Sequence, residues 1–391
     1  TVAGSRKIPV HDRQALLAAR EEILRLTAAS PILMGRHGFS CFGTGSIYDL
    51  MDARRMMPTD NFARTRFDRA GELNAHAYKE EYQPEKYGCM GCHIRCKKIA
   101  RGGGMAGASM PEFETMSHFT ALIGNTDLHL VMAANALCND LGLDTISTAA
   151  TLACYRELAG GIDLAPHLLD LLTRIGTAAD DLGRELGRGA RSFARARQHE
   201  EAAMAVKGLE LPAYDPRGAY GMSLAYALST RGGCHLRAYP ISHEILRKPV
   251  ATDRFTYSGK ARIIKIAEDQ NAVVDSLTAC KFIFFAAGLE EYAKAYSAVT
   301  GIASTAEELL RAGERIYYQE RMMNGANGFT SLDDDLPGRF FREAGSGDVA
   351  LAIRPLDRAA FLAARAKYYR IRGLDEEGRP TPAKIAELDL E

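Results

Sequence analysis

The sequence of 391 residues is 47% hydrophobic and 25% charged, which is the composition of an ordinary soluble globular protein, and it is long enough for two or three domains. Its 49 basic residues equal its 49 acidic residues, so net charge favours neither nucleic acid nor an anionic membrane as a partner. No apolar run approaches the roughly 20 residues that a membrane-spanning helix needs.

Helical periodicity describes most of the first half of the chain. Apolar residues recur at helical spacing over 12–28, which predicts an amphipathic helix. The stretches 42–45 and 54–67 lack such a pattern, and Pro58, Asp60 and Asn61 are turn-forming residues, so we expect a loop there. Pro111 then suits a helix start, with Glu112 and Glu114 placing two carboxylates just before an apolar segment.

A glycine and an aspartate separate the next two predicted helices, which cover about 127–140 and 145–158. Gly142 ends the first of them, and Asp144 is placed to cap the second. Further helices are predicted at 166–175, 178–186 and 192–206.

A break rich in proline and glycine spans 207–218 and is the best candidate for a domain boundary. We therefore predict one helical domain over residues 1–206 and a second over residues 207–391. Beyond the break, the patterns predict helices at 220–230, 258–274, 288–297, 305–323 and 357–370, followed by a turn-rich tail. Because alternating strand patterns are scarce, the predicted fold class is mainly α.

Three cysteines form the most specific local motif of the chain. Cys89, Cys92 and Cys96 have the spacing C-x₂-C-x₃-C, which suits an iron–sulfur cluster or zinc once a fourth ligand is supplied. Cys92 and His93 also complete the C-x-x-C-H pattern of covalent haem attachment, in which Cys96 would have no role. A zinc knuckle usually has its second pair within a few tens of residues, and after Cys96 the next cysteine is Cys138. Spacing alone leaves the three alternatives open.

The other cysteines are Cys41, Cys138, Cys154, Cys234 and Cys280. Cys138 and Cys154 lie on apolar helical faces, where cysteine is usually a small buried hydrophobe. Cys280 lies at the edge of an apolar run, and a fourth ligand from there would join the two halves of the chain. Eight unevenly spread cysteines are not the disulfide framework of a small secreted domain, and no signal-peptide pattern is present, so we expect a reduced, cytoplasmic setting.

Taken together, the motifs resemble the tungsten-containing aldehyde:ferredoxin oxidoreductase family. The resemblance combines the cysteine triplet with the remote sequence Asp-Ser-Leu-x-x-Cys-Lys-Phe that ends at Phe282. Further similar segments follow in family order over nearly the whole chain: Phe42-Gly43-Thr44-Gly45, Pro111-Glu112-Phe113-Glu114, Asn139 to Ser147, Asp215-Pro216-Arg217-Gly218, Arg231 to Leu236, and Arg372 to Gly378.

The resemblance implies a particular domain content. Family members have a β-rich N-terminal domain, which holds much of one face of a pterin cofactor, and two helical domains that pack around a pterin and iron–sulfur site. This chain resembles only the helical domains, so we expect the N-terminal pterin-binding domain to be absent from it, which would account for the abrupt start at Thr1. Such a chain alone is expected to bind little tungstopterin and to be inactive.

The resemblance also implies site residues. Cys89, Cys92, Cys96 and Cys280 would ligate one [4Fe–4S] cluster. A tungsten or molybdenum ion would be held by the dithiolenes of two pterins, and the pterins by two segments whose matching residues are Asn139, Gly142, Leu143 and Asp144, and Asp275, Ala279 and Cys280. Glu114 would accept a proton from water or the hydrated carbonyl, and His235 would hydrogen-bond the substrate oxygen.

Each of these residues also has an ordinary structural interpretation when taken alone. Glu114 would favour a helix N-terminus, His235 would be a satisfied histidine, and Asp144 would be only a helix cap. The sequence also departs from the family pattern. Asn139 stands where the pattern usually begins with Asp, and Thr278-Ala279 replaces Gly-Leu in the second segment, which puts the shape of that loop in question.

The implied function is oxidation of an aldehyde to a carboxylic acid, with electrons leaving through the cluster to ferredoxin or a similar carrier. Two alternatives stand beside it: a tungsten enzyme of the same family with other chemistry, such as an acyl-CoA ring reductase, and a non-catalytic iron–sulfur or zinc module. A homodimer is an open alternative for the oligomeric state, and neither nucleic acid nor a membrane is expected as a partner.

Overall fold

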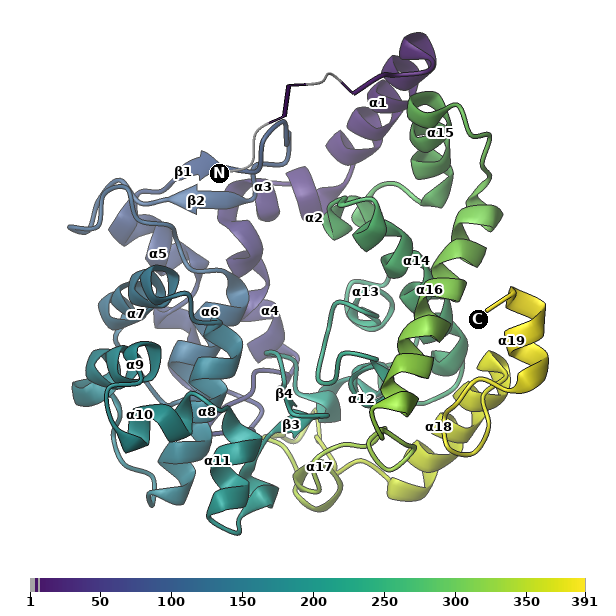
Figure 1. Cartoon of the computed structure of the whole chain (residues 1–391). Helices are drawn as coiled ribbons and strands as arrows, with labels where there is room; N and C mark the ends of the chain where they lie inside the picture. Colours follow the sequence, from purple (N-terminus) through teal and green to yellow (C-terminus); the bar gives the residue numbers. More distant parts are fainter. Residues whose placement is uncertain (1–3, 6–7, 391) are drawn as a thin grey trace.

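The computed structural model describes residues 4–5 and 8–390 and is mainly helical, which confirms the predicted fold class (Figure 1). The outer ends of the two predicted domains, Thr1 and Glu391, lie outside the described residues. In the part of the chain that is described, no helix has both the length and the apolar character needed to cross a bilayer.

The helices of the first half vary widely in length, and most of the long ones coincide with the periodic segments of the sequence. They are α1 (Arg13–Ala28), α2 (Pro31–Met34), α3 (Phe39–Phe42), α4 (Tyr48–Ala53), α5 (Ala75–Tyr82), α6 (Phe113–Ser117), α7 (Leu128–Leu141), α8 (Thr145–Leu158), α9 (Leu168–Thr177), α10 (Asp181–Leu186) and α11 (Ala190–Ala196).

The helices of the second half include the longest of the described chain. They are α12 (Tyr220–Leu228), α13 (Ile241–Glu244), α14 (Lys260–Ser276), α15 (Leu289–Thr300), α16 (Ala306–Ala326), α17 (Arg339–Arg342), α18 (Arg358–Arg372) and α19 (Pro382–Leu388). Helix α14 packs along α16 and α18, and α1 from the other end of the chain packs against α15 (Figure 1).

Two small antiparallel hairpins are the strand content of the described residues. β1 (Glu85–Tyr87) pairs with β2 (Lys97–Ile99), with Tyr87 opposite Lys97, so the cysteine triplet occupies the loop between them. β3 (Ala205–Val206) pairs with β4 (Leu209–Glu210) across a turn at Lys207.

The junction of α7 and α8 follows the prediction closely, because its signals are local. Gly142 has φ 70°, a left-handed conformation that costs glycine little, and α7 ends there. Asp144 then caps α8, since its Oδ1 accepts a hydrogen bond from the Ser147 N–H at 2.8 Å.

Two local predictions are wrong. The expected loop at 54–67 is free of helix, but the one at 42–45 is not, because it runs into the 3₁₀ helix η1 (Gly43–Ile47), and α4, in which Tyr48 and Met51 are fully buried, lies between the two stretches. These short helices are stabilised by tertiary packing rather than by an amphipathic pattern. The helix expected at 192–206 ends at Ala196, because Gln198 takes a left-handed φ of 62° and turns the chain toward β3.

Residues 205–219, which we call the central segment, comprise the β3–β4 hairpin and a run that is buried from Glu210 to Ala219. Asp215 and Arg217 form an ion pair at 2.6 Å with both side chains inaccessible to solvent. Arg217 also donates to the carbonyl oxygens of Phe62 and Glu343 (at 3.2 Å for Glu343), so it joins distant parts of the chain. One large hydrophobic core extends across this segment. The division at 206/207 stays a prediction, and the chain at that point is not an exposed linker.

A buried ion-pair network holds α14, whose C-terminal end leads into the site. Arg372 of α18 pairs with Glu268 at 2.8 Å and with Asp269 at 2.6 Å, and all three side chains are inaccessible to solvent. Because burying charges without partners is costly, this network fixes the position of α14 relative to α18.

Candidate functional site

Glu114 and His235, which lie far apart in the sequence, meet in the structure. Glu114 is in the first turn of α6, and His235 is in the loop that follows α12. The Nε2 atom of His235 lies 3.5 Å from Oε1 of Glu114, and each side chain retains 15% exposure. The pair is therefore nearly enclosed but still reachable.

The central segment positions both members of the pair. The Ala213 N–H donates to Oε2 of Glu114 at 2.8 Å. On the other side, the Gly233 N–H donates to the carbonyl oxygen of Val206 at 3.1 Å and holds the loop that carries His235. Gly232 has φ 99°, and a Cβ atom there would lie 2.4 Å from the Val206 carbonyl oxygen, so this close approach requires glycine.

Burial shifts the two pKa values in opposite directions. Burial raises the pKa of Glu114 to about 8, and the negative charge of Asp144 adds to the rise. The hydrogen bond from the Ala213 N–H lowers this pKa but does not offset the effect of burial. Burial lowers the pKa of His235 to about 3, helped by the positive charges of Arg231, His118 and Lys281. At neutral pH the carboxyl group is therefore mostly protonated and the imidazole neutral. Oε1 of Glu114 is buried without a hydrogen-bond partner among the described residues, and a proton on it would face Nε2 of His235.

The motif Phe42-Gly43-Thr44-Gly45 supports the start of α6. The Thr44 hydroxyl donates to Oε2 of Glu112 and accepts from the Phe113 N–H at 2.8 Å. This satisfies a free N–H group of the first turn, which orients Glu114. Sequence reasoning noted the motif without assigning it this role.

Three further residues around the pair were not predicted. His118 follows Glu114 by four positions, and its Nδ1 lies 2.7 Å from the Glu114 carbonyl oxygen; helical spacing could have indicated it. The rings of Tyr214 and Tyr239 lie 5.6 and 6.3 Å from the His235 ring, and the Tyr239 hydroxyl donates to that of Tyr214 at 3.1 Å. Tyr214 adjoins the motif at 215–218, whereas Tyr239 has no sequence signal.

The two predicted pterin segments have the same backbone form. In the first, Gly142 is left-handed and the Leu143 N–H donates to the Cys138 carbonyl at 2.9 Å. In the second, Thr278 is left-handed with φ 50°, and the Ala279 N–H donates to the Val274 carbonyl at 3.0 Å. Both are Schellman-type helix ends, so the loop keeps its shape although Thr278 replaces glycine.

Hydrogen bonds connect each segment to the element that carries one member of the Glu114–His235 pair: the Thr115 and Thr145 hydroxyl oxygens lie 2.8 Å apart, and the Lys281 ammonium group donates to the Leu236 carbonyl oxygen at 2.7 Å. The charge of Asp144 raises the pKa of Glu114, and the charge of Lys281, next to Cys280, lowers the pKa of His235. Asp275 forms an ion pair with Lys281 at 3.0 Å. The first segment exposes Asn139, Gly142 and Asp144 and half-buries Leu143; the second exposes Asp275 and Cys280 and half-buries Ala279.

The four predicted cluster ligands come from both halves of the chain, with Cys89, Cys92 and Cys96 in the loop between β1 and β2 and Cys280 in the loop that follows α14. Burial raises the pKa of Cys96 to about 11, and negative charge on Glu112, Cys280 and Cys92 adds to this rise. Burial also raises the pKa of Cys280, to which charge on Cys92 and Cys89 contributes. The thiols are thus within electrostatic reach of each other.

The predicted donor set consists of four free cysteines. Among the described residues, no three His, Cys, Asp or Glu side chains are close enough to bind one metal ion together. Four cysteines are the usual ligands of a [4Fe–4S] cluster.

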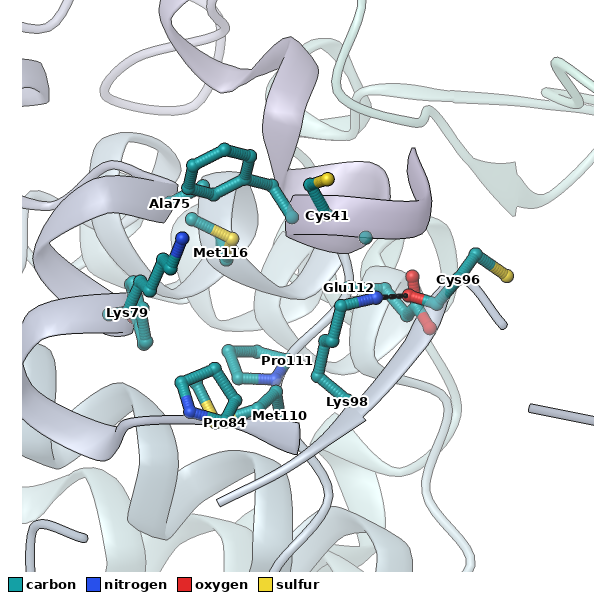
Figure 2. A pocket seen from close by; sticks show the side chains of 13 residues that line it. Cys41, Ala75, Lys79, Pro84, Cys96, Lys98, Met110, Pro111, Glu112 and Met116 are labelled. Carbon is teal, nitrogen blue, oxygen red and sulfur yellow. Dashed lines mark hydrogen bonds between the residues drawn. The ribbon is translucent and has the colours of Figure 1, made fainter. Parts of the chain in front are cut away.

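A pocket adjoins Cys96 on the first half of the chain (Figure 2). Its wall includes Cys41, Lys79 and Glu112 as well as Lys98, whose ammonium group donates to the Cys96 carbonyl at 2.9 Å. Lys98 is 6% exposed and also donates to the carbonyl oxygens of Phe39, Arg95 and Lys97. The ammonium group therefore holds the end of the β1–β2 loop, which carries the cysteine triplet, against α3.

Comparison with known proteins gives a consistent match. The family model described as aldehyde ferredoxin oxidoreductase, domains 2 & 3, matches residues 18–390. Tungsten-containing aldehyde ferredoxin oxidoreductases from Thermococcus kodakarensis and Pyrococcus furiosus are each 32% identical over 415 residues. The match covers 100% of this chain, which spans 66% of the length of these curated relatives.

Two more distant similarities extend the comparison. The aliphatic sulfonate oxidoreductase, WOR-like subunit, of Pyrococcus furiosus is 25% identical over 386 residues, covering 90% of this chain and 58% of that protein. The active-site complex BamBC of benzoyl coenzyme A reductase, solved with 1,5-dienoyl-CoA, aligns with a TM-score of 0.75 at 17% identity, covering 100% of this chain and 67% of that chain. At that identity the likeness concerns the fold alone.

Proposed function

This chain belongs to the aldehyde ferredoxin oxidoreductase family, and we propose that it forms the two helical domains of an enzyme that oxidises an aldehyde to a carboxylic acid. The observation that carries this proposal is the enclosed Glu114–His235 pair between two equivalent helix-end loops. In the net reaction the aldehyde and one water molecule give the acid, two protons and two electrons.

The proposed cofactors would occupy the sites built by these loops. A tungsten or molybdenum bis-pterin centre would supply the two-electron oxidant, with a [4Fe–4S] cluster to carry electrons away singly. Asn139 to Asp144 and Asp275 to Cys280 would hold the two pterins through exposed backbone groups and carboxylates. Cys89, Cys92, Cys96 and Cys280 would ligate the cluster. Because the second loop ends in Cys280, one pterin would adjoin a cluster ligand, whereas Asp144 occupies the same position in the first loop.

The protonation states favour a specific division of roles between Glu114 and His235. A protonated Glu114 can donate a hydrogen bond to the aldehyde oxygen, and neutral His235 can accept a hydrogen bond from the attacking water. This reverses the roles expected from the sequence, in which Glu114 was the acceptor. Tyr214 and Tyr239 enclose the pair, and this low-polarity setting strengthens both interactions.

Substitution in the full-length enzyme, with metal and cluster in place, tests the proposal. Glu114→Gln and His235→Asn should each lower turnover of an aldehyde with an artificial acceptor by about 10²- to 10⁴-fold, the usual contribution of a proton-transfer group. Glu80→Gln, on an exposed face of α5, is the matched control and should retain full turnover. Unchanged turnover in both site variants would show that the pair takes no part in the reaction.

Metal analysis separates this enzyme from a non-catalytic module. The proposed cluster requires four iron atoms per chain, whereas a zinc module would contain one zinc and no iron. Cys280→Ser should lower the iron content, and Cys154→Ser, which alters a buried cysteine of α8, is the matched control. A full complement of iron in the Cys280 variant would remove Cys280 from the ligand set.

A further inference from the structure

The loop that carries the cysteine triplet has a charge that the chain as a whole lacks. Residues 86–98, which we call the cysteine loop, contain four Lys and Arg residues and no Asp or Glu. Over the whole chain, basic and acidic residues are equal in number. The cysteine loop is therefore a local basic region on a protein without net charge.

Three of the four basic side chains of this loop are exposed and without acidic partners among the described residues. Lys86, Arg95 and Lys97 are exposed, and none of them forms an ion pair with a carboxylate of the described residues. Lys86 donates to the Ser40 hydroxyl at 3.0 Å, a contact that leaves its charge in place. An exposed cation without a counterion contributes its full charge to the surface potential.

Neighbouring elements extend the basic region. Arg20 is exposed on α1, and its charge reaches His93 within the cysteine loop. Lys98 adds a buried positive charge behind Cys96 (Figure 2). The nearest carboxylate in sequence, Glu85, is already paired with Arg101.

An apolar centre lies within this basic region. Met90, at the tip of the cysteine loop, is fully exposed at 104% of the reference area, and Tyr87 is 53% exposed. Met, Tyr and Arg are enriched in protein interfaces, where an apolar centre is surrounded by a polar rim. Cys89 is exposed beside them, so a cluster on these ligands would lie close to the same surface.

We infer that Arg20, Lys86, Met90, Arg95 and Lys97 form the docking surface for a small acidic electron-carrier protein of the ferredoxin type. The inference rests on the proposed function, because it assigns this surface to the cluster as the exit for electrons. Each aldehyde oxidised releases two electrons, so two one-electron carriers are reduced in succession. Electrostatic attraction speeds their encounter without requiring a large or tight interface.

Other occupants fit the surface less well. A second copy of this chain placed symmetrically on the same patch would bring basic residues against basic residues. Nucleic acid binding usually needs a wider basic stripe, and this chain carries no net positive charge. Charge complementarity therefore favours an acidic protein.

Charge reversal in the full-length holoenzyme tests the inference. The variant that combines Arg20→Glu and Lys97→Glu changes two exposed residues on separate elements, and Lys367→Glu, exposed on the distant α18, is the matched control (Figure 1). The probe is an oxidised [4Fe–4S] ferredoxin of net negative charge. We expect kcat/KM for this ferredoxin to fall about tenfold at ~0.05 M salt in the double variant, and the difference to shrink at ~0.5 M salt. Turnover with benzyl viologen should be unchanged in both variants.

Direct binding provides a second readout that does not depend on turnover. Fluorescence anisotropy of labelled ferredoxin should show weaker binding to the double variant than to Lys367→Glu. Equal binding by the two variants, equal loss of turnover with both acceptors, or a changed oligomeric state without loss of ferredoxin binding would each overturn the inference. If benzyl viologen supports no aldehyde oxidation by the unaltered enzyme, the proposed function fails, while the anisotropy measurement still decides the docking surface.

Discussion

Glu114→Gln should remove a pH dependence of stability that the structure assigns to one carboxyl group. The pKa of Glu114 is about 8, against an ordinary value of 4.5. Because the folded pKa is raised, the neutral acid stabilises the fold fully below pH 4.5, and this stabilisation is lost as pH rises through 8. A difference of about 3.5 pH units, at about 1.36 kcal/mol each, corresponds to about 5 kcal/mol.

Gln is the neutral isostere of the protonated acid, so its amide keeps the hydrogen bond from Ala213 and faces His235. Relative to the Gln variant, the unaltered chain should lose about 1.4 kcal/mol of unfolding free energy per pH unit between pH 5 and 8. Urea unfolding followed by circular dichroism at pH 5, 6, 7 and 8 measures this difference directly. Glu80→Gln, exposed on α5, is the control and should follow the unaltered chain. A difference between Glu114→Gln and the unaltered chain that stays constant over this range would refute the burial argument.

Three further predictions concern the loops and the central segment. Both Thr278 and Gly142 are left-handed, a conformation that glycine adopts at little cost. Thr278→Gly should therefore raise the free energy of unfolding by about 1 kcal/mol, and Gly142→Ala should lower it by about the same amount. Urea unfolding measures both changes, and opposite signs would contradict the prediction. Asp144→Ala should lower the free energy of unfolding by about 1 kcal/mol, because it removes the N-cap of α8. Asp144→Asn should keep most of that stability, since the asparagine side-chain oxygen can also accept the Ser147 N–H. Equal losses in the two variants would show that the cap is not the cause. Asp215→Asn should lower the free energy of unfolding by about 3–5 kcal/mol, because it leaves Arg217 buried without its partner. Thermal unfolding measures this loss, and a loss below about 1 kcal/mol would show that the ion pair is dispensable.

Local signals predicted the parts of the fold that depend on local physics. The end of α7 at Gly142 and the cap of α8 at Asp144 follow from backbone conformation and one side-chain hydrogen bond, both of which the sequence displays. α4 could not be predicted in this way, because its stability comes from burying Tyr48 against distant residues. The early end of α11 was missed for a related reason, since nothing at Gln198 announces a left-handed residue.

The site was predictable to a different degree. Glu114 and His235 carry no individual signal, and only the resemblance in motif order related them; their approach to 3.5 Å is a property of the tertiary structure. The pKa shifts of the pair, upward for Glu114 and downward for His235, depend on burial, which is not visible in a sequence. At Thr278 a sequence rule is misleading. The rule reserves left-handed positions for glycine and so predicts a changed loop, but Thr278 itself takes the left-handed conformation and the loop keeps its shape.

The central segment also bears on how the protein resists proteases. Its residues from Glu210 to Ala219 are buried, although two prolines and a glycine there would suggest an easily cleaved hinge. A protease must bind an extended, accessible stretch of backbone, so it could cut here only after the surrounding core has opened. Limited digestion of the native protein should therefore spare this segment. A cut there would mark global unfolding and would release Glu114 and His235 from each other at the same time.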